Sequence, residues 1–308
     1  MITETDIQII TLLQGNGRLS YAEIADSIGI TSTTAAKRIK DLIKSDIMSI
    51  RAMLNPYELG LTEGAFIGAR IEIDKQENIY NKLIRNNFVT TILSTIGDFD
   101  LLFIVRDLSW EALNQFITDE FAFMDGVIDY DCRYIKETVK RYHHIFGDGK
   151  SYRIAPEIKQ LDWDIIEHLC QNGRISNSEL SKNLGHHVST ISRRVSYLTE
   201  NDFIRIQSQP NPTKFGYASS VIFTTHVNMA QCDEICRVLS QYDDIFLILT
   251  TINRPNLIVG IHAKSNEEIV DLINDKIQTI SGIKQVEVFL RSKVIKSSYG
   301  WYIDHVLH

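Results

Sequence analysis

The segment SNSELSKNLGHHVSTISRRVSYL, residues 176–198, repeats the pattern of an earlier segment, SYAEIADSIGITSTTAAKRIKDL, residues 20–42. Each position in one segment lies 156 residues from its counterpart in the other, as the first positions show (176 − 20 = 156). Both segments space apolar residues three or four positions apart, which is typical of amphipathic helices. Both also carry a glycine, Gly29 or Gly185, between two short helical stretches. The fold therefore depends on how far this repeat extends.

The same spacing relates residues well outside the two segments. The matched pairs are Asp6/Asp162, Gly17-Arg18/Gly173-Arg174, Asp46/Asp202, Asn55-Pro56/Asn211-Pro212, Gly60/Gly216, Thr95/Thr251, Gly126/Gly282 and Lys140/Lys296. A fixed period indicates a duplicated structural unit, here of about 140 residues. The turn-forming stretch at 143–157 is predicted to be the linker between the two copies.

Composition and charge restrict the class of protein. The 308 residues are 44% hydrophobic and 23% charged, as in ordinary globular proteins, and the net charge is −7. No apolar run approaches the roughly 18 residues of a membrane span, and the first residues lack a basic signal region. We therefore expect a cytoplasmic protein with no membrane partner. The acidic charge argues against a protein that coats nucleic acid but permits a local basic surface.

Cysteine usage predicts neither a metal site nor a cofactor. The four cysteines are Cys132, Cys170, Cys232 and Cys236. Only the last two are close together, and a zinc site would need a second Cys or His pair. We expect free thiols in a reducing compartment.

The first third of each unit is predicted to be helical. Ile7, Ile10 and Leu13 fall on one helix face, and Ala35, Ile39 and Leu42 fall on another. Helices this short must pack on one another to be stable. We therefore predict helix-turn-helix domains at 1–54 and 158–210.

The rest of each unit changes from helical to alternating periodicity. In the first copy, strands are expected at 65–73, 89–96, 100–105 and 127–135, with helices at 77–86 and 109–121. This βαββαβ order predicts ferredoxin-like domains at 62–142 and 218–300. The predicted fold class is α+β, a tandem repeat of a winged or three-helix helix-turn-helix followed by a ferredoxin-like domain.

The third helix of each helix-turn-helix carries the residue types that contact DNA. Small hydroxyls approach base edges and phosphates, and Lys and Arg contact phosphates or guanine. In the first copy Lys37, Arg38, Lys40 and Lys44 outnumber Asp41. The predicted DNA-binding residues are Ser32, Thr33, Thr34, Lys37, Arg38, Lys40, Ser189, Thr190, Ser192, Arg193 and Arg194. The alternative is a solvated face of a domain that serves only for packing.

The two copies differ at the start of this helix. Thr31, a good N-cap, is replaced by His187, a poor one. The second copy is also less basic, so its DNA binding is the weaker expectation.

The pattern LGHHVSTISRRVSYLTENDFI, residues 184–204, resembles the Lrp/AsnC, or feast/famine, regulators. The resemblance covers nearly the whole of both units. It implies a transcription regulator that binds double-stranded DNA sequence-specifically. It also implies ferredoxin-like (RAM-type) domains that pair, assemble into oligomers and bind an amino-acid effector. Members of that family usually carry one unit per chain, so two fused units predict a pseudo-dimer within this chain.

The same resemblance places an effector at Gly97, Asp98 and Asp100. Asp98 has the charge to pair with an α-amino group, and Gly97 lets the backbone approach a ligand. The counterpart of this stretch is Asn253-Arg254-Pro255-Asn256, which lacks that acidic character. The alternative reading is a tight β-turn with a structural glycine.

No enzyme motif is present in the sequence, and we expect no catalytic activity. The alternative of an enzyme comes from a second resemblance, to siroheme decarboxylases, which share this two-part architecture. Those enzymes carry a His/Arg-rich stretch on the second strand, whereas here only His262 lies nearby, on the third. A sensor that no longer binds DNA is the remaining alternative.

Overall fold

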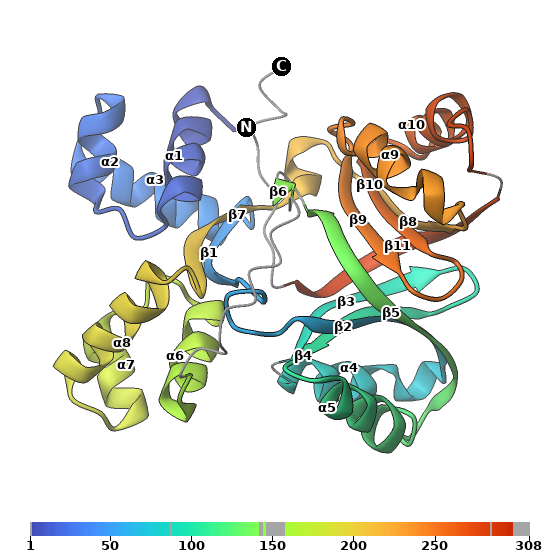
Figure 1. Cartoon of the computed structure of the whole chain (residues 1–308). Helices are drawn as coiled ribbons and strands as arrows, with labels where there is room; N and C mark the ends of the chain where they lie inside the picture. The colour runs from blue at the N-terminus through green and yellow to red at the C-terminus, as the bar shows by residue number, and fades with distance from the viewer. Residues whose placement is uncertain (1, 87, 142–143, 146–157, 284, 298–308) are drawn as a thin grey trace. The chain divides into compact units, whose positions relative to one another are not determined.

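The computed structural model describes residues 2–86, 88–141, 144–145, 158–283 and 285–297. It forms two compact units (Figure 1). Among these residues, the helical unit comprises 2–60 and 158–215, and the barrel unit comprises 61–86, 88–141, 144–145, 216–283 and 285–297. The predicted linker at 143–157 lies outside the described residues, apart from the short strand β6, His144–Ile145. Among the described residues, no helix is long and apolar enough to cross a membrane.

The helical unit contains the two predicted helix-turn-helix domains. The helices are α1 Glu4–Gly15, α2 Tyr21–Ile28 and α3 Ser32–Lys44, then α6 Gln160–Gln171, α7 Asn177–Leu184 and α8 Val188–Glu200. Ser20 and Thr31 cap α2 and α3, because their hydroxyls accept hydrogen bonds from the Glu23 and Thr34 amides. The buried side chains Ile10, Leu13 and Ile39 form part of the first core, at 1% exposure or less.

A strand follows the third helix in each copy, and these two wings pair with each other. They are β1, Met48–Leu54, and β7, Ile204–Pro210, and they run antiparallel. Arg51 lies opposite Gln207, its own counterpart in the repeat. The two copies in the helical unit are therefore related by a local two-fold axis through this residue pair, which sequence periodicity did not predict.

Two matched glycines allow this close approach. The Gly17 amide donates to the Ile206 carbonyl at 2.7 Å, and the Gly173 amide donates to the Ile50 carbonyl at 2.8 Å. A Cβ at Gly17 would lie 2.9 Å from the backbone of Gln207. The equivalent atom at Gly173 would lie 2.8 Å from Ile206 and 3.1 Å from the backbone of Arg51. Only glycine therefore fits at either position without a shift of the opposing strand.

The matched arginines Arg18 and Arg174 complete the contact. We call the whole contact the wing seam: it consists of β1, β7, the two glycines and these two arginines. Arg18 donates to the carbonyls of Gly173 and Ile175, both at 3.0 Å. Arg174 donates in the reverse direction to the carbonyls of Gly17 at 3.2 Å and Leu19 at 2.8 Å. Residues that the repeat preserves are thus the ones that hold its two copies together.

The barrel unit has the predicted βαββαβ order twice. The first copy contains β2 Glu63–Ile71, α4 Gln76–Arg85, β3 Val89–Ile96, β4 Leu101–Asp107, α5 Trp110–Gln115 extended by a π-helical turn Phe116–Phe121, and β5 Val127–Arg141. The second contains β8 Ser219–Thr225, α9 Met229–Ser240, β9 Ile245–Thr251, β10 Leu257–Ala263, α10 Asn266–Asp271 extended by Leu272–Ile277, and β11 Val286–Ser297.

The last strand of the first copy is longer than predicted. We expected it to end at residue 135, but β5 continues to Arg141. The added part pairs with β9, from Glu137 opposite Thr250 to Arg141 opposite Leu247. The prediction was wrong here because the partner that orders this part belongs to the other copy.

The two predicted sheets join into one closed barrel. The strand order is β2-β4-β3-β11-β8-β10-β9-β5, and β5 pairs back with β2. Phe66, Leu102, Ile222 and Leu249 belong to a buried cluster inside the ring. Closure removes exposed sheet edges among these strands.

Matched lysines tie each long strand to a helix of the other copy. The Lys140 ammonium, on β5, donates to the carbonyls of Ser240 at 2.9 Å and Tyr242 at 2.8 Å, at the end of α9. Lys296, on β11, does the same at the end of α4. A cation at a helix C-terminus satisfies carbonyls that the helix leaves open.

Candidate nucleic-acid interface

The turn between α2 and α3 is built by two local residues. Gly29 ends α2 with a φ of 74°, in the left-handed region that glycine adopts without strain. Thr31 then starts α3, accepting from the Thr34 amide at 3.2 Å. The predicted DNA-binding residues Ser32, Thr33, Thr34, Lys37 and Lys40 are all exposed. The hydroxyl of Thr34 is already hydrogen-bonded to that of Thr31 at 2.8 Å.

Arg38 has a contact within its own domain. Its Nη1 lies 2.9 Å from the Asp6 carboxylate and 3.1 Å from the Thr3 hydroxyl. Burial raises the pKa of Asp6, but hydrogen bonds from Thr3 and Arg38 outweigh it, so the net pKa is lowered. Arg38 therefore joins α3 to the start of α1, and its side chain is 36% exposed. DNA contact by Arg38 stays a prediction.

Fewer of the predicted DNA-binding residues are exposed on α8 than on α3. Ser189, Ser192 and Arg193 are exposed, whereas Thr190 is half-buried. His187 precedes the helix without a side-chain capping hydrogen bond, in keeping with its poor capping chemistry. The exposed cation among the predicted contacts on this helix is Arg193.

Arg194 repeats the contact of Arg38 at greater depth. Its Nε lies 2.6 Å from one oxygen of Asp162, and its Nη2 contacts the other oxygen. Asp162 is fully buried, and the Arg194 guanidinium also lies over the Tyr197 ring, 4.4 Å from its centroid. This bidentate pair fixes α8 to α6. DNA contact by Arg194 stays a prediction.

The predicted effector hairpin joins β3 to β4. The Asp100 carboxylate accepts a hydrogen bond from the Ile71 amide at 3.1 Å. The side-chain oxygen of its counterpart Asn256 accepts from the Val227 amide at 2.9 Å. In both copies, the side chain at this site therefore holds the backbone of the neighbouring segment. Gly97 and Asp98 are exposed, and the Asp98 carbonyl accepts from Arg70 at 3.1 Å. Of the three predicted residues, Asp98 presents its carboxylate to solvent.

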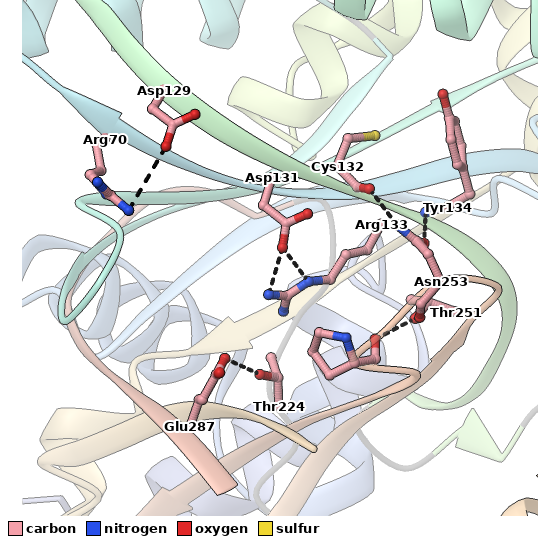
Figure 2. A network of polar contacts seen from close by, with 11 residues as sticks. Arg70, Asp129, Asp131, Cys132, Arg133, Tyr134, Thr224, Thr251, Asn253 and Glu287 are labelled. Atoms are coloured by element: carbon pink, nitrogen blue, oxygen red, sulfur yellow. Dashed lines mark hydrogen bonds and ion pairs between the residues drawn. The ribbon is translucent and has the colours of Figure 1, made fainter. Parts of the chain in front are cut away.

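Figure 2 shows how the second hairpin is attached differently. The Asn253 side chain donates to the Cys132 carbonyl at 2.7 Å and accepts from the Tyr134 amide at 3.1 Å. Its counterpart is Gly97, which has no side chain to make this bridge. Arg133 lies nearby, nearly fully buried, and pairs with Asp131 at 2.7 Å. The two equivalent hairpins of the duplicated barrel are therefore chemically distinct.

A group of polar side chains inside the barrel was not predicted. Arg106 donates to the Thr138 hydroxyl at 2.6 Å, and Arg141 donates to the Thr91 hydroxyl at 2.5 Å. His262, the repeat counterpart of Arg106, is also buried. The alternation in β4 could have predicted the burial of Arg106, because Arg106 shares one strand face with Leu102 and Ile104. Among the described residues, no cluster of three or more His, Cys, Asp or Glu side chains is arranged to hold a metal.

Fold and site together define a winged helix-turn-helix protein with an α+β barrel, both duplicated within one chain. Residues 2–47 and 158–205 match a winged helix-turn-helix DNA-binding model, and residues 227–304 match an AsnC-type model described as a C-terminal dimeric alpha+beta barrel domain. The HTH-type transcriptional regulator FL11 of Pyrococcus furiosus is 30% identical over 128 residues, which are 41% of this chain and 84% of that protein. Ptr1 of Methanocaldococcus jannaschii, also an HTH-type transcriptional regulator, is 31% identical over 121 residues, 39% of this chain and 82% of that protein. The chain belongs to the Lrp/AsnC family.

A solved structure matches the chain along its whole length. The crystal structure of the siroheme decarboxylase NirDL covers 99% of this chain and 96% of its own, with a TM-score of 0.63 and 16% identity. This likeness establishes a shared tandem fold. The identity is too low to carry the activity of that enzyme to this chain.

Proposed function

We propose that this protein is a transcription regulator that binds double-stranded DNA through α3 and α8. The observation that carries the proposal is the face of α3, where three hydroxyl residues and the ammonium groups of Lys37 and Lys40 are exposed together. Such a helix suits the major groove, with hydroxyls at its N-terminal end and cations along the phosphates.

The wing seam supports a two-site mode of binding. It joins α3 and α8, the two helices proposed to read DNA (the reading helices), within one unit, where the local two-fold axis at Arg51 and Gln207 relates them. A protein with two-fold symmetry suits a DNA site with two half-sites. Because α3 is more basic than α8, we expect one half-site to be bound more strongly than the other.

The proposal is tested by DNA binding of the full-length protein. Bound fragments are first selected from genomic DNA, and their affinities are then measured by fluorescence anisotropy at several salt concentrations. Lys37→Ala and Lys40→Ala should each weaken binding and reduce the salt slope by about one unit if each lysine contacts a phosphate. Lys264→Ala, an exposed lysine of the barrel unit, is the matched control and should change neither.

Equal affinity and salt slope for the wild type and the Lys37/Lys40 double variant would refute the proposal. Loss of binding in the Lys264 variant as well would point to non-specific charge rather than to α3.

The second part of the proposal is an amino-acid effector at the β3–β4 hairpin. The exposed Asp98 carboxylate is the group available to an α-ammonium, since Asp100 is bonded to the Ile71 amide. A panel of amino acids is screened by thermal shift. A stabilisation that Asp98→Ala abolishes supports this site, and a stabilisation that survives the substitution removes Asp98 from it.

A decarboxylase-like enzyme is the second candidate function. It is favoured by the whole-length match to NirDL, which has also been crystallised with an iron-uroporphyrin III analogue. On the regulator proposal, the purified protein has no tetrapyrrole absorbance and releases no carbon dioxide from siroheme. Turnover of siroheme would instead assign the chain to the enzyme class.

A further inference from the structure

The repeat allows the two reading helices to be compared position by position. Their buried sides are alike: Ala35, Ile39 and Leu42 of α3 correspond to Ile191, Val195 and Leu198 of α8, and all six are at most 6% exposed. Their exposed sides differ in chemistry. Because both helices pack in the same way within their domains, the difference concerns what each helix offers to DNA.

The first residue of α8 is an exposed valine. Val188 is 45% exposed, whereas its counterpart Ser32 begins α3 with a hydroxyl. The N-terminal residues of a reading helix are the ones that reach base edges in the major groove. There an apolar side chain fits the methyl group of thymine, while a serine hydroxyl bonds to several bases. Val188 therefore offers a preference for thymine that Ser32 lacks.

The second turn of each helix presents an exposed cation, and these two cations differ. Arg193 of α8 corresponds to Lys37 of α3. Among the described residues, no hydrogen bond or ion pair engages the Arg193 guanidinium. Its planar fork matches the O6 and N7 acceptors of guanine, whereas an ammonium is a point charge without that fork geometry. Arg193 therefore offers base selectivity, and Lys37 offers mainly charge.

The C-terminal half of each helix differs in charge. Lys40 and Lys44 of α3 correspond to Ser196 and Glu200 of α8, and all four side chains are exposed. Lysines contact phosphates without regard to base sequence, whereas phosphates repel a glutamate. α3 thus has the stronger phosphate-binding chemistry, and α8 has the stronger base-reading chemistry.

We propose that α8 selects the base sequence while α3 supplies sequence-independent phosphate contacts, so that the chain binds a non-palindromic site in one orientation. The half-site under α8 contains a guanine for Arg193 and a thymine for Val188. The half-site under α3 is loosely defined, because serine and threonine hydroxyls bond to several bases. This inference rests on the proposed DNA binding and states which sequence features the bound DNA carries.

The experiment selects bound sequences from a random pool of duplex DNA with the full-length protein and then measures affinities by fluorescence anisotropy. Sequence preference should be confined to one half-site, which contains the guanine and the thymine. Deoxyuridine in place of that thymine removes one methyl group and should weaken binding about fourfold. Replacement of the guanine should weaken binding roughly 5- to 150-fold. The same replacements in the other half-site should have little effect.

Matched substitutions separate the roles of the two helices. Val188→Ser gives α8 the hydroxyl of Ser32 and should bind the thymine and deoxyuridine sites equally. Arg193→Lys gives α8 the cation of Lys37, so it should keep the salt slope and lose most of the preference for guanine. Lys37→Ala is the reciprocal control: it should reduce the salt slope by about one unit and leave the base preference unchanged.

A site that is defined on one side, with preferences that Val188→Ser and Arg193→Lys remove, supports the inference. Two mirror-image half-sites of equal definition would overturn it, as would a base preference that either substitution leaves intact. Salt-dependent DNA binding without any sequence preference would overturn the inference alone. Absence of all DNA binding would refute the proposed function, and the inference with it.

Discussion

Arg193 and Arg194 are neighbours on α8, yet their environments differ. Arg193 is exposed, while Arg194 bonds the fully buried Asp162 through two nitrogens. Lys37 and Arg38 differ in the same way on α3, where Arg38 contacts Asp6. A basic residue on a reading helix is thus not automatically a DNA contact. The sequence identified the basic stretch, but the partner of each cation lies on another helix.

These neighbours give a test at the residue scale. Arg194→Ala leaves a buried carboxylate without its cation and should lower the free energy of unfolding by about 3 kcal/mol. Arg193→Ala should leave stability unchanged and weaken DNA binding. Urea denaturation and fluorescence anisotropy on both variants measure the two effects. Similar stability for the two variants would contradict the structural role of Arg194.

The wing strands show what happens at the scale of the element. Each wing is a single strand in its own copy and gains its partner only from the other wing, in register from Met48 opposite Pro210 to Leu54 opposite Ile204. A lone strand leaves its backbone N–H and C=O groups without sheet partners, so the pairing of β1 with β7 stabilises both copies together. The β5 extension from residue 136 to 141 depends on β9 in the same way.

Gly17 and Gly15 provide a matched pair for this element. Gly17→Ala places a Cβ 2.9 Å from the backbone of Gln207 and should destabilise the helical unit by about 1–3 kcal/mol. Gly15→Ala has nothing within 4 Å and lies in α1, so it should be neutral or stabilising by about 0.5–1 kcal/mol. Chemical denaturation of both variants checks the difference. A Gly17 variant as stable as the wild type would mean that the wing seam accommodates the added Cβ without a loss of folding free energy.

At the scale of the whole molecule, duplication turns contacts between subunits into contacts within one chain. The matched barrel model describes a dimeric domain, and here both copies of the ferredoxin-like domain contribute strands to one closed ring. The copies have also diverged: at equivalent hairpins, Gly97 has no side chain, whereas Asn253 bonds to β5. Fusion permits this difference, because each copy then mutates separately.

An intrachain barrel has a measurable consequence. The midpoint of urea denaturation should not move over a hundredfold range of protein concentration, because folding needs no second chain. Circular dichroism at several concentrations measures it. A midpoint that rises with concentration would show that contacts between chains contribute to the stability of the fold.

The sequence by itself determined the repeat, the helix-turn-helix domains and the βαββαβ order. These features are encoded locally, by apolar spacing, by caps such as Ser20 and Thr31, and by glycine turns such as Gly29. Only the tertiary structure decided the wing seam, the closed barrel, the engagement of Arg38 and Arg194, and the burial of Arg106 and Arg141 inside the barrel. Periodicity shows that a face is buried, but not which face from a segment some 156 positions away will cover it.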